Sequence, residues 1–214
     1  MAFWKKKQQT EEAETPKKSQ LRDWTEALIV AGILALIIRT FVVQAFKIPS
    51  GSMEDTLLIG DHLLVNKFIY GTHMPFDDDP YFVIRDPQRG DVIVFEFPGD
   101  KDLGYFKRRD FIKRVIGLPG DEIEIRGKNV FVNGDRYMTP QAVFKGSTVN
   151  IALKTVVPDN QYFVLGDNRN NSQDSRFWGF VDRSKIKGLA FIKYWSWDSD
   201  NFSPRLNRIG RTID

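Results

Sequence analysis

Short runs of apolar residues, each closed by turn-forming residues, follow one another through most of the chain. The clearest runs cover residues 61–65, 91–97, 122–125, 129–135, 161–166 and 188–192. Runs of this length that are rich in Val, Ile and Phe and end at Gly, Pro, Asn or Asp are typical of β-strands. No long amphipathic pattern follows residue 47. The chain therefore predicts a mainly β domain over residues 47–214, which is long enough to fold around its own core.

The N-terminal part of the chain has a different pattern. Residues 1–23 mix basic and acidic side chains and predict a solvated polar tail. An unbroken apolar run over residues 27–38 follows, and beyond Arg39 the chain soon becomes apolar again. Residues 24–46 together reach the roughly 20 residues that a helix needs to cross a bilayer, and an Arg near one end can extend its charge to the headgroups. We therefore expect a transmembrane anchor over residues 24–46.

Basic residues are more frequent before this segment than directly after it. The positive-inside rule then places the N-terminus in the cytoplasm and exports the domain that follows. Two other interpretations of the segment stay open, a helix buried in the core and a cleaved signal peptide. Val43-Gln44-Ala45 matches the small-residue pattern of a cleavage site, which favours the second of these.

Composition narrows the chemistry that the domain can perform. The 214 residues include no Cys and two His, and the formal net charge is +3. Thiol nucleophiles and Cys-ligated zinc sites are therefore excluded, and we expect neither a metal nor a cofactor. The chain has no dense basic block, so nucleic acid is not an expected partner. A hydrolase built from this chain must use Ser or Thr, acidic residues or Lys.

Two stretches carry side chains suited to such chemistry. Residues 50–52, Ser-Gly-Ser, lie close behind the expected anchor, although the same residues also form ordinary turns. Lys113 and Arg114 interrupt an apolar stretch, so one of the two cations is expected to face inward. A desolvated Lys is neutral more often and can take a proton from a serine, whereas an Arg cannot. An exposed charge pair on a strand is the alternative for this second stretch.

A third stretch, residues 166–181, is too dense in hydrogen-bonding side chains for an ordinary connection. It does not fit a calcium-binding loop, because Ser172 occupies the position where that loop requires Gly. A polar shell that orients an active group suits it better, with Asp174 and Arg176 able to pair. A Ser-His-Asp triad built on His62 also stays open, although the chain lacks the Gly-x-Ser-x-Gly elbow that carries many such serines.

These three stretches, in this order behind one apolar segment, resemble the bacterial type I signal peptidases. The similarity extends from about Arg39 to Val181, with an echo at residues 208–210, and is carried by the blocks at residues 48–53, 89–95, 113–121 and 166–169. It implies a mainly β catalytic domain of the signal peptidase type with one N-terminal transmembrane helix. The implied enzyme is a single-pass serine endopeptidase of the bacterial plasma (inner) membrane, with its catalytic domain on the outer face. Its implied substrates are exported preproteins with Ala-x-Ala-like cleavage sites, cut alongside the export machinery.

The resemblance also assigns roles to individual residues. It makes Ser52 the nucleophile and Lys113 the general base of a Ser-Lys dyad that works through an acyl-enzyme. The Ser52 backbone N–H and the Ser50 hydroxyl would form the oxyanion hole, and Ser172 would hydrogen-bond the Lys113 amine. The supporting residues that it implies are Asp167, Asp174 and Arg176. Our candidates for the substrate pocket are side chains that flank the dyad in sequence, namely Ile48, Pro49, Met53, Leu57 and Ile112.

Two positions depart from the family pattern. Asp55 stands where a Pro is common, and Asn170 stands where Asp is usual. Neither change removes the dyad, so an active enzyme is expected. Two other functions stay open: a self-cleaving repressor-type Ser-Lys peptidase, for which residues 1–46 offer no DNA-binding module, and a non-enzymatic membrane-anchored β scaffold.

Overall fold

The chain divides into two compact units, residues 1–37 and residues 38–214. The structure, a computed structural model, describes residues 20–71, 81–104, 107–147 and 151–213. Most of the polar tail expected over residues 1–23 lies outside the described residues, so that expectation stays a prediction.

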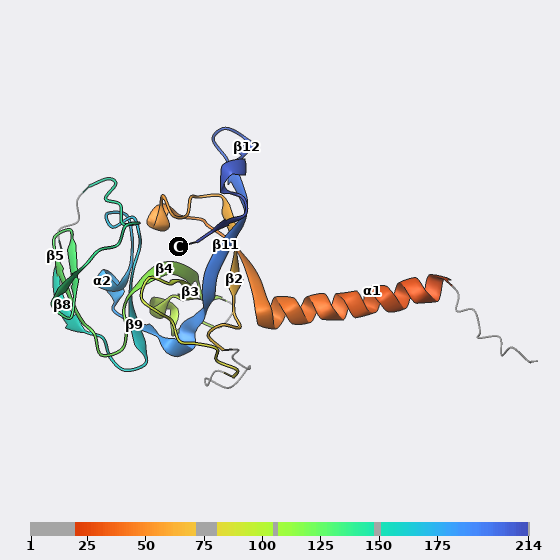
Figure 1. The fold of residues 1–214 in the computed structure, drawn as a ribbon, viewed down its shortest axis with the longest axis horizontal. Coiled ribbons are helices and arrows are strands. Elements are labelled where there is room, and N and C mark those ends of the chain that lie inside the picture. The colour runs from red at the N-terminus through yellow and green to blue at the C-terminus, as the bar shows by residue number, and fades with distance from the viewer. Residues whose placement is uncertain (1–19, 72–80, 105–106, 148–150, 214) are drawn as a thin grey trace, which may run out of the picture. The chain divides into compact units, whose positions relative to one another are not determined.

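The described part of the first unit is one helix, α1 (Gln20–Ile37) (Figure 1). Large apolar side chains are exposed along it, among them Trp24, Leu28 and Ile33. In the described ranges, no helix combines the length and the apolar character needed to cross a membrane. The transmembrane anchor expected over residues 24–46 is therefore not confirmed.

The C-terminal end of the expected anchor is corrected by the structure. After α1, one π-helical turn covers Ile38–Val42, and Val43–Lys47 form the strand β1. β1 pairs antiparallel with β2 (Asp61–Asn66). β-branched and aromatic residues favour a pleated strand wherever a partner offers hydrogen bonds, and β2 offers them here. The last residues of the expected span therefore belong to the β domain.

Most of the second unit is one large antiparallel sheet. Its strand order is β1-β2-β11-β3-β4-β9-β10, and two short strands, β12 and β13, pair with β11 as well. The remaining bounds in this sheet are β3 (Val92–Glu96), β4 (Asp110–Gly117), β9 (Gln161–Leu165), β10 (Val181–Asp182), β11 (Ile186–Asp198), β12 (Ser203–Pro204) and β13 (Arg211–Thr212). Figure 1 shows the long β11 beside β2, with which it pairs over much of its length. The mainly β fold predicted from the sequence is confirmed.

A smaller sheet has the order β7-β6-β5-β8. Its strands are β5 (Glu122–Arg126), β6 (Asn129–Val132), β7 (Asp135–Tyr137) and β8 (Ala152–Val156). Asn133 and Gly134 join β6 to β7 with φ values of 54° and 88°, the positive values that a tight hairpin turn requires. The two sheets share one core cluster, which contains Ile116, Ile123, Ile125, Val130, Val132, Val157, Phe163 and Leu165.

Short helical turns complete the second unit. One helix, α2 (Ser175–Trp178), follows β9, and 3₁₀ turns cover Gly51–Met53, Pro98–Asp100, Arg183–Lys185 and Leu206–Arg208. The first of these turns lies between β1 and β2 and packs on a core cluster that includes Leu63 and Val92. The sequence-predicted site residues therefore come from three places: this turn, β4, and the segment between β9 and α2.

Candidate active site

Ser52 lies on the 3₁₀ turn Gly51–Met53, which follows the connection from β1. The Leu57 N–H donates to the Met53 carbonyl at 2.7 Å, and the Asn168 N–H donates to the Ser52 carbonyl at 3.1 Å. Ser52 is 8% exposed and Met53 is fully buried. The turn is thus anchored in the core on one side and to the segment after β9 on the other.

Lys113 lies on β4 and is buried beside this turn. Its Nζ donates to Ser52 Oγ and to the Ile112 carbonyl, both at 2.9 Å. Burial lowers the pKa of Lys113 to about 8, while the charges of Asp174 and Asp167 act in the opposite direction. At pH 7 about one molecule in ten then carries a neutral amine, since each unit of pKa is a factor of ten. The amine is therefore close enough, and often enough neutral, to accept a proton from the serine.

Arg114, the second cation of the pair, is buried as well, although the sequence led only to the expectation that one of the two faces inward. Its Nε and Nη2 donate to the Asp167 carboxylate at 2.9 and 2.8 Å, and its Nη1 donates to the Gly90 carbonyl. Thr56 Oγ1 donates to the same carboxylate at 2.6 Å. Asp167 thus neutralises the second cation and ties it to the segment that follows Ser52.

The expected ion pair between Asp174 and Arg176 is present. Arg176 Nε and Nη2 donate to the carboxylate at 2.8 and 2.9 Å, and both side chains are buried. Asp174 also caps α2 and accepts the Gly166 N–H at 3.1 Å. Arg176 Nη2 donates to the Arg169 carbonyl at 2.6 Å. The pair therefore fixes the whole segment between β9 and α2.

Ser172 is buried close to Ser52, but the hydrogen bond expected between it and Lys113 is not formed. Within the described residues its Oγ has no hydrogen-bond partner. Its side chain packs against Gly166, where an added Cβ would overlap Ser172 Oγ and lie 2.5 Å from the Ser52 carbonyl oxygen. The Lys113 amine donates instead to Ser52 Oγ and to a backbone carbonyl of its own strand.

The other predicted residues divide between surface and core. Ser50 and Pro49 are exposed. Ser50 has an extended backbone (φ −137°, ψ 157°), and its side chain does not cap the turn that follows. The apolar pocket candidates belong to one core cluster or pack against it: Ile48, Met53, Leu57 and Ile112. Most of the expected pocket walls thus support the Ser52 turn from beneath, and their part in binding stays a prediction.

The alternative triad built on His62 is not assembled. The His62 ring packs edge-on against Tyr194, with 5.9 Å between the ring centroids. Asp61 is fully buried, and its carboxylate accepts from Arg208 Nη2 and from Ser196 Oγ, each at 2.6 Å. The acid that would orient the imidazole of a triad is therefore bound to other donors.

One departure from the family pattern, Asp55, follows the Ser52 turn, and the other, Asn170, lies between β9 and α2. Asp55 has a φ of 74°, which the ring of a Pro cannot adopt. Lys145 Nζ donates to Asp55 at 2.5 Å and to Glu54 at 3.2 Å. The side-chain nitrogen of Asn170 is buried without a hydrogen-bond partner among the described residues.

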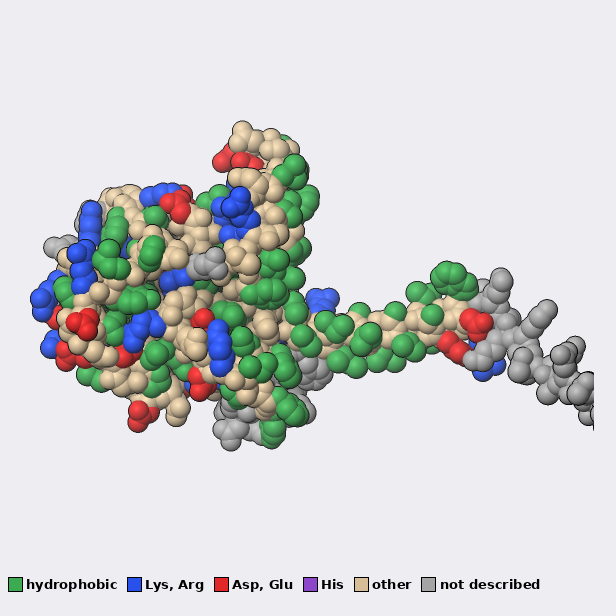
Figure 2. Space-filling model, in the orientation of Figure 1, with side chains coloured by type: hydrophobic (Ala, Val, Ile, Leu, Met, Phe, Trp, Pro, Cys, Tyr) green, Lys and Arg blue, Asp and Glu red, His purple; other side chains and the backbone are tan. Residues whose placement is uncertain are grey.

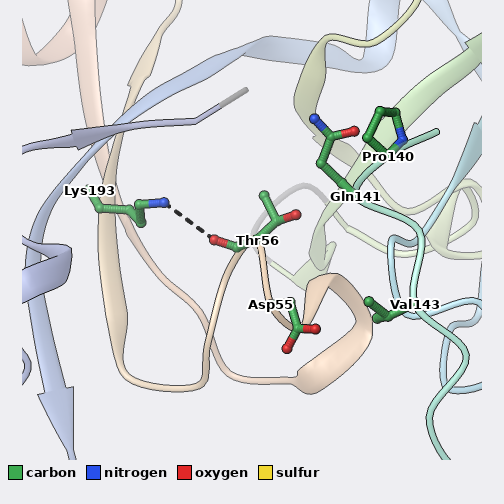
Figure 3. Close-up of a pocket in the computed structure, with 6 residues that line it drawn as sticks. All are labelled: Asp55, Thr56, Pro140, Gln141, Val143 and Lys193. Atoms are coloured by element: carbon green, nitrogen blue, oxygen red, sulfur yellow. Dashed lines mark hydrogen bonds between the residues drawn. The ribbon is translucent and has the colours of Figure 1, made fainter.

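Two shallow hollows border the segment that follows Ser52. Figure 3 shows the first, which is lined by Asp55, Thr56, Pro140, Gln141, Val143 and Lys193. Within it, Lys193 Nζ donates to the Thr56 carbonyl at 3.4 Å. The second is lined by Glu54, Lys145, Gly146, Ser147, Asn168, Asn170 and Asn171. In the described part of the chain, no group of His, Cys, Asp or Glu side chains is arranged to hold a metal ion.

Sequence reasoning missed three residues that support the site. Arg114 had one usable signal, its place beside Lys113 in an apolar stretch, but nothing in the sequence identified its counterion. Thr56 carried no signal, because a hydroxyl bonded to a distant carboxylate looks ordinary in a sequence. Gly166 begins one of the blocks that carry the resemblance, but the sequence did not show that Ser172 packs against it. The supporting role of all three residues follows only from the contacts described above.

A serine hydroxyl bonded to a buried lysine amine on a mainly β scaffold is an arrangement that suits a hydrolase working without a His base. The family model described as "Signal peptidase, peptidase S26" matches residues 21–195. The chain belongs to this family, and it is accordingly a serine peptidase, a hydrolase.

Similarity to individual relatives covers most of the chain. The "Probable signal peptidase I-2" of Synechocystis sp. is 42% identical over 186 residues, which cover 85% of this chain and 77% of that protein. Signal peptidase I of Pseudomonas fluorescens is 35% identical over 233 aligned positions, which cover 91% and 80% of the two chains. A crystal structure of a signal peptidase I from Enterococcus faecalis matches 49% of this chain and 97% of that chain, with 32% identity and a TM-score of 0.41.

Proposed function

We propose that this chain removes signal peptides from exported preproteins, with Ser52 as the nucleophile and Lys113 as the general base. The observation that carries the proposal is the 2.9 Å hydrogen bond between Lys113 Nζ and Ser52 Oγ, formed by two buried side chains. The relatives named signal peptidase I support the choice of substrate. An Ala-x-Ala-like sequence before the scissile bond is part of the proposal.

The chemistry proceeds in two halves. In the first, the neutral Lys113 amine takes the Ser52 proton as Oγ bonds to the scissile carbonyl carbon, which gives a tetrahedral intermediate. The C–N bond then breaks, the leaving amine takes the proton from the Lys113 ammonium, and the signal peptide remains as an ester on Ser52. In the second half, water gives a proton to Lys113 and attacks the ester, and the proton returns to Ser52 Oγ as the C–O bond breaks.

Burial of Lys113 makes this base usable near neutral pH. An ordinary lysine pKa of 10.5 leaves fewer than about one amine in a thousand neutral at pH 7. The lowered value of about 8 raises that fraction roughly 300-fold. Arg114 cannot replace Lys113, because a guanidinium keeps its proton at any accessible pH.

The oxyanion hole is proposed at the start of the turn. The Ser52 backbone N–H and the Ser50 hydroxyl would donate to the negative oxygen of each tetrahedral intermediate. Ser50 suits this role because it is exposed two residues before the nucleophile, and its side chain is not used to cap the turn. Removal of one such donor typically costs about 10²–10³ in rate, which is the loss expected for Ser50→Ala.

We infer that the signal peptide binds in extended form along two strand edges. Among the described strands, β1 is an edge strand of the large sheet. β4 pairs with β3 from Asp110 to Arg114, but its pairing with β9 begins only at Arg114. The first half of β4 therefore has one side without a strand partner in the described part of the chain. Backbone hydrogen bonds to these edges would bind many different sequences, as signal peptides require.

We also propose that the apolar segment that begins at Trp24 and forms most of α1 holds the enzyme in the bacterial plasma membrane, with the N-terminus in the cytoplasm and the peptidase domain outside. Figure 2 shows α1 covered by apolar side chains along its length. A helix with apolar residues on all faces is unfavourable in water and suits a lipid environment. Leu28→Lys with Ile33→Lys should move the protein from the membrane fraction to the soluble fraction. Unchanged membrane recovery of this double variant would contradict the proposed anchor.

The catalytic proposal is tested with the full chain in detergent and a purified preprotein. Ser52→Ala and Lys113→Met should each abolish cleavage. Lys193→Met is the matched control, because Lys193 is also a buried lysine and its amine donates to the Thr56 carbonyl, and this variant should retain most of the activity. Activity in Lys113→Met would contradict the proposed dyad. Loss of activity in His62→Ala would support the alternative triad built on His62.

The same assay separates the other candidate functions. A self-cleaving peptidase would fragment its own chain and leave the preprotein intact. A non-enzymatic scaffold would cut neither, although the protein remains folded. Preprotein cleavage that depends on Ser52 therefore excludes both alternatives.

A further inference from the structure

The start of β4 and the connection before it place two aromatic rings and a guanidinium close to one another and to Lys113. The Phe97 and Phe111 rings are stacked, with centroids 4.5 Å apart and 20° between their planes. The Arg109 guanidinium lies 4.8 Å from the Phe97 centroid and 5.9 Å from the Phe111 centroid. Lys113 Nζ lies 5.3 Å from the Phe111 centroid. We call Phe97, Phe111 and Arg109 the aromatic bracket; it connects the exposed end of the hairpin of β3 and β4 to the buried amine.

Arg109 is held over the rings by Asp100. Its Nε and Nη2 donate to the Asp100 carboxylate at 2.8 and 2.7 Å, and its backbone N–H donates to the same group at 2.9 Å. These hydrogen bonds lower the pKa of the Asp100 carboxyl to about 2. Asp100 therefore stays ionised, and the bracket stays intact, throughout the pH range in which the dyad titrates.

The Phe97 ring is fixed by a glycine and by other aromatic side chains. A Cβ on Gly99 would lie 2.5 Å from Phe97 Cε1, so the ring folds over a position that only a glycine leaves open. The Trp178 ring packs against Phe97 edge-on, with 6.0 Å between centroids, and also against Phe95 at 5.8 Å. Phe97 is thus held in one place, and Phe111 stacks on it.

We propose that Phe97 and Arg109 are positioning residues, which hold Phe111 against Lys113 and so keep water from the dyad. This inference rests on the proposed function, because it concerns the same amine. Phe111 is only partly buried and lies on the half of β4 that lacks a second strand partner among the described residues. Without the bracket its ring can turn away, which opens the buried amine to solvent.

Loss of the bracket has two opposing effects on the pKa of Lys113. Entry of water raises it, because burial is the largest cause of its lowering. Loss of the Phe111 ring face lowers it, because the ring attracts the ammonium form. The other charged groups that act on this amine are Asp174 and Asp167, each paired with its own arginine and not touched by the bracket. Since burial is the largest cause, the net shift is upward.

Steady-state cleavage as a function of pH tests the proposal. In Phe97→Ala the acidic limb of kcat should move up by about half a unit, so kcat at pH 7 falls about threefold while KM changes less than about twofold. Gly99→Ala should shift the limb in the same direction, because its methyl group displaces the Phe97 ring without removing it. Phe97→Tyr keeps the stack and should keep the native profile. Phe131→Ala is the control, because Arg126 lies 5.0 Å from the Phe131 centroid and both residues belong to the smaller sheet, which does not contain Lys113.

Each outcome bears on the inference. Two results in both Phe97→Ala and Gly99→Ala would mean that the bracket does not shield Lys113. In one, kcat is lower at every pH but the acidic limb of the profile does not move. In the other, the acidic limb moves to lower pH. If Phe97→Ala does not fold, Gly99→Ala, which retains both rings, decides whether the bracket shields Lys113. Cleavage by Lys113→Met would place the failure in the proposed dyad itself. If Lys113→Met is inactive and the acidic limb does not move in the bracket variants, only the shielding role of the bracket is overturned.

Discussion

Replacing Asp167 with Asn tests how the site keeps two neighbouring cations buried. Asp167 accepts hydrogen bonds from Arg114 at 2.9 and 2.8 Å and from Thr56 at 2.6 Å. The side chains of Asp167 and Arg114 are 0% and 3% exposed. Asn has nearly the volume of Asp but no charge, so the substitution removes the carboxylate that accepts two hydrogen bonds from the buried Arg114 guanidinium.

The size of the effect follows from this burial. Breaking a buried ion pair by removing one partner costs about 3–5 kcal/mol, because the remaining charge stays desolvated. With a urea m-value of about 2 kcal/mol per M, the midpoint of unfolding should fall by roughly 2 M. The double variant Arg114→Met with Asp167→Leu removes both charges and should recover most of the loss, since apolar replacement of a whole buried pair is often neutral.

Urea unfolding of the full chain in detergent, followed by Trp fluorescence, measures these midpoints. Glu124→Gln is the matched control, because Arg126 donates to Glu124 at 2.6 and 2.7 Å but 65% of its side chain is exposed. Its midpoint should not change, since exposed pairs contribute little. The reasoning is refuted if Asp167→Asn is as stable as this control, or if the double variant is as unstable as the two single changes added together.

Three further predictions concern the dyad and its surroundings. Preprotein cleavage should rise about tenfold per pH unit up to about pH 8 and then level off, because only the neutral form of Lys113, whose pKa is about 8, accepts the serine proton; a flat kcat profile below pH 8 contradicts this. Lys113→Met should be inactive yet have a higher urea midpoint at pH 7. The folded pKa lies below the ordinary 10.5, so native stability should rise between about pH 8 and 10.5, and this rise should be missing from the variant. Gly166→Ala should destabilise the chain by about 1–3 kcal/mol and lower kcat, because the new Cβ overlaps Ser172 and crowds the Ser52 carbonyl; adding Ser172→Ala should restore part of the loss in both assays.

The strands followed from the sequence wherever local pattern was strong. Residues 91–97, 122–125 and 161–166 became β3, β5 and β9, since their apolar residues are continuous or alternate and their ends carry turn residues. β8 (Ala152–Val156) was not predicted. It contains Ala and Lys, which have weak strand preference, and it is held by antiparallel pairing along all of β5.

The end of the expected anchor was misplaced because hydropathy alone does not distinguish a residue that faces lipid from one on a β-strand. Val43 and Ala45 are apolar in the sequence, and apolar residues suit a lipid environment and an edge strand equally well. The structure pairs Val43 with Asn66 and Ala45 with Leu64, partners that a local window along the chain does not contain. Long-range pairing therefore set this boundary.

The site shows the same division between local and long-range information. One inward cation was expected from the apolar neighbours of Lys113 and Arg114, and the resemblance implied that it is Lys113. The structure places Lys113 within hydrogen-bonding distance of Ser52. The burial of Arg114 beside it was not expected, because its counterion, Asp167, is 53 residues away. The expected bond from Ser172 to Lys113 depended on side-chain directions, which sequence motifs do not specify.

Each buried acid of the site is paired with an arginine, and this pairing bears on the pKa of Lys113. The charges of Asp174 and Asp167 both act to raise the pKa of Lys113, against the effect of burial. A bare carboxylate at either position would favour the ammonium form and withdraw the amine from its proposed role as a base. Each acid is instead bound by a guanidinium through two hydrogen bonds, and the positive charge beside it offsets part of the effect of the carboxylate on the amine. In the proposed mechanism, the ion pairs that fix the segment after β9 therefore also limit how far the two acids raise the pKa of Lys113.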